Sequence, residues 1–324
     1  MRKDRILIIG AFGQLGTELT QVLAQHYGAE NVVLADIRKP ALSNGLASLH
    51  PFAPLNVMES KQLGQVIEKY QISQIYHLAA VLSASGEQDP FFAWQLNMDG
   101  TLNVLAAALE KGVRKVFFPS SIAVFGPTTP RQHTPQFTIM EPTTVYGISK
   151  QAGERWAEYY FQRYGLDVRG LRYPGLISYK TPPGGGTTDY AVAIFHQALA
   201  GKSFRCFLGP ETYLPMMYMP DAVRATCELM EAEASQIRVR SAYNLGALSF
   251  SPREISLALQ NHFPDFEVMY EPDFRQAIAD SWPESIDDSA ARQDWGWQPA
   301  YDLEALVSDM LHHLRLVSQS AGVL

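Results

Sequence analysis

A tyrosine and a lysine four positions apart are the residues of this sequence whose types and spacing best suit acid–base chemistry. Tyr146 and Lys150 fall in a segment of helical periodicity near Val145–Tyr164, where this spacing places both side chains on one face about one turn apart. A tyrosine hydroxyl has an ordinary pKa of about 10, too high for a useful base at neutral pH. A neighbouring positive charge stabilises the phenolate and lowers that pKa. The pair therefore predicts a proton-transferring tyrosine tuned by a lysine.

A serine pair follows a run of apolar residues earlier in the chain. Ser120 and Ser121 come directly after Lys115–Phe118, which reads as a buried strand. Serine is also a common turn residue. In a parallel sheet, however, a hydroxyl at the carboxyl end of a strand faces the crevice where ligands bind. Beside the tyrosine and lysine, we expect Ser121 to hold a substrate oxygen.

Three spaced glycines predict a phosphate-binding turn near the start of the chain. Gly10, Gly13 and Gly16 follow the expected strand Arg5–Ile9 and lead into the expected helix Gln14–His26. Glycines there permit a tight turn and a close approach of the backbone to a pyrophosphate. The amino end of the helix directs its free amides and its dipole at the phosphates. Strand, glycine turn and helix in this order indicate a dinucleotide site.

An aspartate at the end of the next strand selects the kind of dinucleotide. Asp36 follows the run Val32–Ala35 and lies 36 − 16 = 20 residues after Gly16. A carboxylate at this place accepts hydrogen bonds from the ribose hydroxyls and repels a 2′-phosphate, which favours NAD over NADP. An arginine nearby can recruit a phosphate, but for Arg38 we expect a solvated or adenine-stacking side chain.

The elements that must position these residues alternate between strands and helices. Besides those named above, Ile75–Ala80 and Val168–Tyr173 read as strands, and Glu59–Tyr70 and Phe91–Lys111 as helices. Strict alternation implies right-handed parallel crossovers. The predicted fold class is α/β, a Rossmann-type doubly wound parallel sheet with a smaller C-terminal substrate-binding lobe.

The sequence changes character after Gly175. Residues 181–186, TPPGGG, cannot lie inside a regular element and form either a linker or a mobile loop over a site. Shorter elements follow, ending in an amphipathic helix at about Leu303–Leu316. We expect a dinucleotide-binding domain over residues 1–175 and a mostly substrate-binding lobe over 176–324, with segments near 215–247 returning to the first domain.

Composition excludes several classes of protein. The 324 residues carry a net charge of −7, which argues against a nucleic-acid partner. No run is apolar and long enough for a signal peptide or a membrane span, so a cytoplasmic location is expected. Cys206 and Cys227 are too few for a disulfide scaffold or a cysteine zinc site, and His312 and His313 point to different helix faces, so no metal is predicted.

Taken together, these motifs resemble the extended short-chain dehydrogenase/reductase family over the whole chain. The residues that carry the likeness are the glycine turn, Asp36, Ala79-Ala80, Asn97, Ser121 and the segment 146–150, YGISK. The resemblance implies that Tyr146 is the acid/base, that Ser121 holds the substrate oxygen, and that Lys150 binds the nicotinamide ribose and lowers the tyrosine pKa. Asn97 would support the proton relay. One departure is Asn56-Val57, where most relatives carry Asp-Val to hold adenine; Asn56 can still accept from the adenine amino group.

The resemblance also implies which residues bind the cofactor, NAD. This set comprises Gly10, Phe12, Gly13, Gln14, Leu15, Gly16, Asp36, Ile37, Arg38, Asn56, Val57, Leu78, Ala79, Ala80, Asn97, Ser120, Tyr146, Lys150, Tyr173 and Pro174.

Within the family, the C-terminal part is similar to the branch that oxidises L-threonine. Segments 171–178 (LRYPGLIS), 184–190 (GGGTTDY), 214–221 (LPMMYMPD) and 243–246 (YNLG) carry this likeness, with Ser281–Pro283 and Asp294–Trp297. It implies L-threonine as the substrate and a homodimer formed through the helices at Phe91–Lys111 and Val145–Tyr164. The expected substrate-binding residues are Ser83, Ser121, Tyr146, Gly175, Thr187, Thr188, Asp189 and Trp282.

A nucleotide-sugar 4-epimerase or dehydratase with tightly held NAD is the alternative. Such an enzyme needs cationic groups for a diphosphate. The lobe contains four candidate arginines, for which surface exposure or pairing with nearby carboxylates is the expected role: Arg205, Arg224, Arg238 and Arg240.

Overall fold

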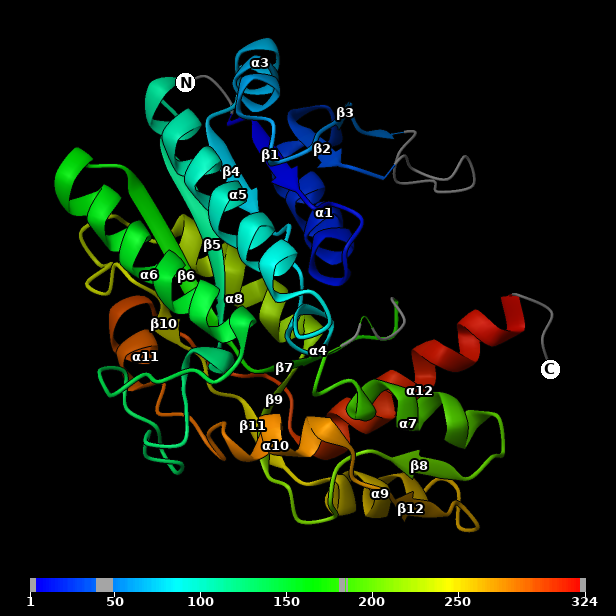
Figure 1. The fold of residues 1–324 in the computed structure, drawn as a ribbon. Helices are drawn as coiled ribbons and strands as arrows, with labels where there is room; N and C mark the ends of the chain where they lie inside the picture. Colours follow the sequence, from blue (N-terminus) through cyan, green and yellow to red (C-terminus); the bar gives the residue numbers. More distant parts are fainter. Residues whose placement is uncertain (1–3, 39–48, 181–183, 185, 321–324) are drawn as a thin grey trace.

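A seven-stranded parallel sheet forms the centre of the molecule (Figure 1). The computed structural model describes residues 4–38, 49–180, 184 and 186–320. Every neighbouring pair of strands in this sheet is parallel, which confirms the Rossmann-type fold class expected from the alternating pattern. In spatial order the strands are β10 (Tyr243–Asn244), β6 (Asp167–Tyr173), β5 (Lys115–Ser121), β4 (Gln74–His77), β1 (Ile6–Ile9), β2 (Val32–Asp36) and β3 (Phe52–Pro54).

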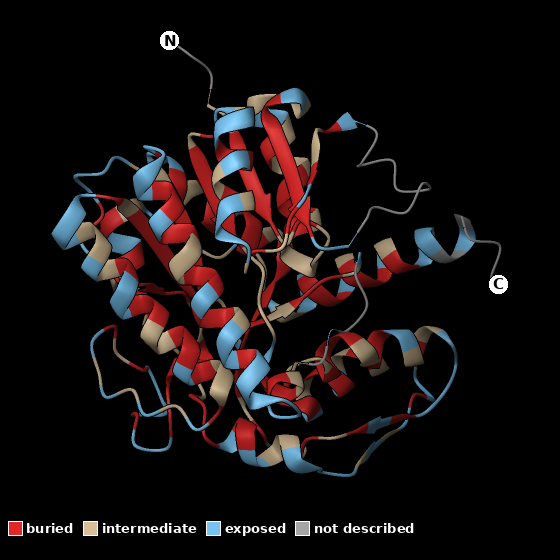
Figure 2. Ribbon diagram, turned by 45° about the horizontal axis from the view of Figure 1, so that its top comes forward, coloured by how far each residue is buried: buried red, intermediate tan, exposed pale blue. Residues whose placement is uncertain are grey.

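Helices cover both faces of the sheet, and this explains why its inner strands are continuous apolar runs. In β1, Ile6 and Ile8 face one hydrophobic core, whereas Leu7 and Ile9 face the other. One face is covered by α1 (Gln14–Tyr27), α8 (Met219–Glu231) and α11 (Ser289–Trp295), the other by α3 (Ser60–Tyr70), α5 (Pro90–Glu110) and α6 (Val145–Tyr164). Figure 2 shows the strands as the most thoroughly buried part of the molecule.

The two helices nearest the expected chemistry have strong local start signals. The side chain of Asp89 caps α5 by accepting from the Phe92 amide, with Pro90 in the first turn. Thr144 caps α6 by accepting from the Gly147 amide. Helix α6 ends at Gly165, whose φ of +72° lies in the left-handed region that glycine tolerates. Local capping thus fixes where Tyr146 and Lys150 fall on α6.

A smaller lobe lies beneath the carboxyl edge of the main sheet (Figure 1). It is built on a three-stranded sheet of β7 (Gly175–Ile177), β9 (Leu214–Tyr218) and β11 (Leu248–Phe250), and on the strand pair β8 (Phe204–Cys206) and β12 (Val268–Tyr270). Its helices are α7 (Tyr190–Leu199), α9 (Pro252–Gln260), α10 (Phe274–Asp280) and α12 (Leu303–Ser320). Short helical turns complete the chain at η1 (Ala29–Asn31), α4 (Ser83–Gly86) and η2 (Ile122–Val124).

Late segments of the chain pack on the dinucleotide side of the molecule. Strand β10 extends the main sheet beside β6, and α8 packs on α1. Helix α11 and Trp297 join the same core, although the expected boundaries assign this segment to the lobe. The segment expected as a linker or loop, 181–186, lies outside the described residues at 181–183 and 185. The division at residue 175 stays a prediction.

In the part of the chain that the structure describes, no helix is both long and apolar enough to cross a membrane.

The close contact of α6 with β5 depends on Gly153. A methyl group at this position would overlap the ring of Phe118 on β5. We therefore expect Gly153→Ala to lower the free energy of unfolding by about 1–3 kcal/mol in urea denaturation, the usual cost of overpacking a core. Gly64→Ala is the matched control, since the nearest atom to its added methyl is the flexible Lys111 Cε at 3.5 Å. That variant should instead gain about 0.5–1 kcal/mol from helix propensity. Equal effects of the two substitutions would contradict the packing argument.

Candidate active site

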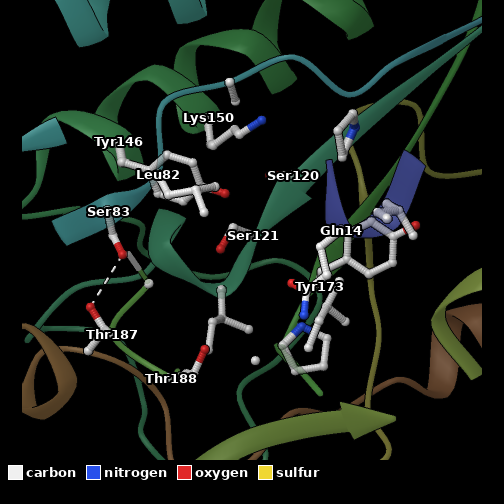
Figure 3. Close-up of a pocket in the computed structure, with 18 of the residues that line it drawn as sticks. Gln14, Leu82, Ser83, Ser120, Ser121, Tyr146, Lys150, Tyr173, Thr187 and Thr188 are labelled. Carbon is white, nitrogen blue, oxygen red and sulfur yellow. Dashed lines mark hydrogen bonds between the residues drawn. The ribbon is translucent and has the colours of Figure 1, made fainter. Parts of the chain in front are cut away.

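A cavity of about 260 Å³ opens at the carboxyl edge of the main sheet (Figure 3). It lies between the glycine turn, the ends of β5 and β6, the start of α6 and the lobe. The expected site residues that line it are Gly10, Gly13, Gln14, Leu15, Gly16, Leu78, Ala80, Ser83, Ser120, Ser121, Tyr146, Lys150, Tyr173, Pro174, Gly175, Thr187, Thr188, Asp189 and Trp282.

Tyr146 and Ser121 face each other across this cavity (Figure 3). The Ser121 oxygen accepts the Ala123 amide at 3.2 Å, which leaves its proton free to donate. A hydrogen bond with Ser121 lowers the pKa of Tyr146, but burial has the larger effect and raises that pKa to about 12. The pair therefore presents two hydroxyls to one point in the cavity.

Lys150 lies one turn beyond Tyr146 on α6. Its ammonium is 5.5 Å from the centre of the Tyr146 ring and 5.1 Å from that of Phe118. Burial lowers the pKa of Lys150 to about 8. Loss of solvent disfavours the charged form of both groups. In the protein by itself, the pKa of Tyr146 thus lies above its ordinary value, whereas the sequence predicts a lowered one.

A buried histidine near this lysine is held in its neutral form. His77 ends β4, and its Nε2 lies 3.2 Å from the Thr101 hydroxyl. Burial and the charge of Lys150 together lower the pKa of His77 to about 3. The imidazole is therefore neutral at physiological pH and adds no positive charge beside Lys150.

The glycine turn has the shape of a phosphate cradle. Gly10 adopts a φ of +84°, and a Cβ there would lie 2.8 Å from the Ala79 nitrogen. A Cβ at Gly16 would crowd the backbone oxygens of Gly10 and Ala11. The amino end of α1 begins at Gln14, beside the cavity. Backbone amides, a helix dipole and the absence of side chains fit a dinucleotide pyrophosphate.

Asp36 lies beside this turn although it does not line the cavity. Its carboxylate accepts the Phe12 amide at 3.1 Å and the Arg38 amide at 3.0 Å. The guanidinium of Arg38 also pairs with it at 3.2 Å and is 63% exposed. Ile37, which lies between Asp36 and Arg38 in the sequence, is exposed. The acid is therefore held at the end of β2, next to the turn that precedes α1.

The remaining expected cofactor residues do not line the cavity. The Asn56 side chain accepts the Met58 amide at 3.1 Å, and Val57 is buried. Asn97 binds both backbone groups of Val81 and donates to Ser149 at 3.1 Å. Its amide thus joins the segment after β4 to α6. The expected residues that do not line the cavity are Phe12, Asp36, Ile37, Arg38, Asn56, Val57, Ala79 and Asn97.

The substrate side of the cavity is built from hydroxyls and one indole. The Ser83 and Thr187 oxygens lie 3.3 Å apart and connect α4 to the loop before α7 (Figure 3). Asp189 accepts the Gly186 amide at 2.8 Å and so shapes this loop. Trp282 is buried in the wall. Cavity residues that the sequence reasoning missed are Leu82, Pro119, Ile122, Leu176 and Gly186; as neighbours of predicted positions they carry no chemical signal of their own.

The four candidate arginines of the sequence analysis do not line the cavity and are paired with carboxylates. Arg205 pairs with Glu271 and Arg238 with Asp294. Arg240 pairs with Asp167, and Arg224 with Asp221 and Glu228. Among the described residues that line the cavity, Lys150 is the single cationic side chain.

Comparison with known proteins places this site in a family. Residues 6–246 match the model of the NAD dependent epimerase/dehydratase family. The chain belongs to this family. That assignment confirms the resemblance to the extended short-chain dehydrogenases/reductases.

Individual relatives are similar to this chain over nearly all of its length. The mitochondrial L-threonine 3-dehydrogenase of Bos taurus is 48% identical, covering 96% of this chain and 82% of that protein. The GalE-like L-threonine dehydrogenase of Cupriavidus necator, in its holo form, is 54% identical with a TM-score of 0.93, covering 96% and 99%. A monomeric L-threonine 3-dehydrogenase from a metagenome, in its apo form, is 43% identical with a TM-score of 0.92, covering 96% and 99%.

Proposed function

We propose that this protein is a metal-independent, NAD-dependent L-threonine 3-dehydrogenase. The observation that carries the proposal is a cavity that joins Ser121, Tyr146 and Lys150 to small hydroxyl side chains, with no further cation among its described lining residues. The near full-length likeness to L-threonine dehydrogenases supports it. The reaction is L-threonine + NAD⁺ → 2-amino-3-ketobutyrate + NADH + H⁺.

A small zwitterion suits the lining of this cavity. The hydroxyls of Ser83, Thr187 and Thr188 can donate to an α-carboxylate, and the Asp189 carboxylate can accept from an ammonium. Trp282 closes the wall with an apolar surface. These features favour an amino acid as the substrate.

The mechanism we infer uses Tyr146 as the base. The Ser121 hydroxyl donates to the Cβ oxygen of L-threonine, and the Tyr146 phenolate accepts the proton of that oxygen. Bound NAD⁺ supplies the acceptor for the hydride that leaves Cβ and adds a positive charge to the cavity. Lys150 contributes a second positive charge beside the phenolate. Together they offset the burial that raises the pKa of Tyr146 in the protein alone.

A nucleotide-sugar epimerase is the less supported reading. A diphosphate needs cationic donors, ideally arginines in a bidentate geometry. The cavity has no arginine among its described lining residues. The four candidates for such a clamp all pair with carboxylates: Arg205, Arg224, Arg238 and Arg240.

A homodimer through α5 and α6 is a further part of the proposal. The two helices pack side by side and carry exposed apolar side chains. They include Phe91, Trp94, Ile148, Trp156 and Tyr159, with 39–85% of each exposed. Isolated exposed apolar residues are ordinary, but a group on two adjacent helices marks a surface for association. The cytoplasmic location expected from the sequence also stays a prediction.

The direct test is NADH absorbance with candidate substrates. We expect NADH to form with L-threonine and not with UDP-glucose. NAD⁺ should be preferred to NADP⁺, because the Asp36 carboxylate repels a 2′-phosphate. Absence of NADH from L-threonine and NAD⁺ would overturn the proposal. Interconversion of UDP-sugars would favour the epimerase.

Tyr146→Phe should lower kcat by a factor of about 10²–10⁴, the usual contribution of general acid–base catalysis. NAD binding, measured by calorimetry, should change little. In the wild type, kcat should rise with pH as Tyr146 loses its proton, and this rise should be absent in the variant. Tyr164→Phe, at the exposed end of the same helix, is the matched control and should retain wild-type kcat. Retained turnover in Tyr146→Phe would remove this residue from the mechanism.

Sedimentation velocity tests the dimer. We expect a mass of twice 36.1 kDa at micromolar concentration. Trp156→Glu should return the protein to 36.1 kDa, because a charge in an apolar interface is left unpaired. A monomeric wild type would refute the interface.

A further inference from the structure

A fully buried ion pair lies behind the site, and the proposed mechanism does not use it. Glu154 on α6 and Arg172 on β6 are 0% and 2% exposed. They form two parallel bonds, from Arg172 Nε to Glu154 Oε1 and from Nη2 to Oε2, each 2.8 Å long. Removing two charges from water costs several kcal/mol per ion in proteins, so such pairs add little stability compared with apolar residues. Arg172 also donates to the Gln136 oxygen at 2.9 Å and to Asn244 Oδ1 at 3.0 Å, so it ties β6 to neighbouring segments, whereas Glu154 faces the end of β5.

The carboxylate of Glu154 connects three elements at the edge of the cavity. It lies two turns beyond Tyr146 and one turn beyond Lys150 on α6. Ser120 donates to Glu154 Oε1 at 2.6 Å from the end of β5. Arg172 is the register partner of Ser120 in the β5–β6 ladder. One side chain thus holds the base-bearing helix and two strand ends in a fixed relation.

The bond from Ser120 bears directly on its neighbour, Ser121. Ser121 is the last residue of β5 and the cap of η2, where its oxygen accepts the Ala123 amide. The direction of its hydroxyl toward Tyr146 therefore depends on how the end of β5 is held. Ser120 is buried, and Glu154 is the one partner that its hydroxyl has within the described part of the chain.

We propose that Glu154 is a positioning residue for the reaction, acting through Ser120 to aim the Ser121 hydroxyl at Tyr146. Arg172 holds the Glu154 carboxylate in a fixed orientation through its two bonds. The inference rests on the proposed dehydrogenase function. It gives Glu154, four residues beyond Lys150 on α6, a part in the geometry of the reacting hydroxyls.

Ser120→Ala tests the proposal without disturbing the ion pair. With saturating L-threonine and NAD⁺, we expect kcat to fall by about 5- to 50-fold, a usual cost of small misplacement in a reacting geometry. The KM for NAD⁺ should change less than kcat, although Ser120 lines the cavity. Because the Ser121 bond lowers the pKa of Tyr146, weakening it should move the acid limb of the kcat–pH profile to higher pH. A structural role alone would not move that limb.

The matched control removes a similar bond far from the site. Ser73 donates to the Asp4 carboxylate at 2.8 Å, at the opposite end of β4. Ser73→Ala should keep wild-type kcat and its pH profile. Wild-type kcat and profile in Ser120→Ala would overturn the inference, as would a raised KM for NAD⁺ with unchanged kcat, which would make Ser120 a cofactor contact.

A second variant replaces the charged pair by apolar side chains. Glu154→Met combined with Arg172→Met leaves no unpaired charge, and such exchanges are tolerated in other buried ion pairs. We expect this double variant to show the same loss of kcat and the same shift of the acid limb as Ser120→Ala. Adding Ser120→Ala to it should have no further effect, since the acceptor is already absent. Additive losses would contradict the proposal. If the double variant does not fold, Ser120→Ala alone decides.

An inactive wild type would instead refute the proposed function itself. Wild-type activity is measured first, so the two failures are distinguishable.

Discussion

Helix α6 approaches β5 closely enough to form the site because residue 153 has no side chain. Phe118 fills the space beside Gly153, and its ring then lies under the ammonium of Lys150. Both reacting hydroxyls depend on this contact, since Tyr146 belongs to the helix and Ser121 to the strand. A wider separation of the two elements would leave each hydroxyl in place on its own element but apart from the other. The polar contacts of the site can form only because this apolar contact brings α6 close to β5.

Burial has opposite consequences for the two titrating groups of α6. It raises the pKa of Tyr146 to about 12 and lowers that of Lys150 to about 8, since each loses solvent around its charged form. The protein by itself thus holds the tyrosine protonated at neutral pH. Under the proposed function, the positive charge of the oxidised cofactor favours the phenolate, which couples formation of the base to cofactor binding. His77 is neutral, so it adds no positive charge of its own that would favour the Tyr146 phenolate before the cofactor binds.

Much of the fold and the cavity was predictable, because the signals are local. Apolar runs marked the inner strands, and the glycine turn and the Tyr146–Lys150 spacing marked the lining of the cavity. The short edge strand β3 was missed, since three residues ending in proline carry no clear hydrophobic pattern. The cofactor roles expected for Asn56 and Asn97 stay predictions. Their contacts within the protein were not foreseen: Asn56 accepts the amide of Met58, two residues on, and Asn97 binds the backbone of Val81, 16 residues away. Glu154 and Arg172 left one weak signal, charges in segments otherwise expected to be buried.

The sequence by itself determined the order of the elements, their periodicity and the chemistry of Tyr146, Lys150, Ser121 and the glycine turn. These depend on spacing within single helices, strands and turns, which neighbouring residues decide. Only the tertiary structure decided how deeply these groups are buried, and therefore the direction in which their pKa values move. It alone joined Ser83 to Thr187 and Ser120 to Glu154, residues 104 and 34 positions apart. The physical reason is that desolvation and long-range hydrogen bonds arise only when the sheet, α6 and the lobe pack together.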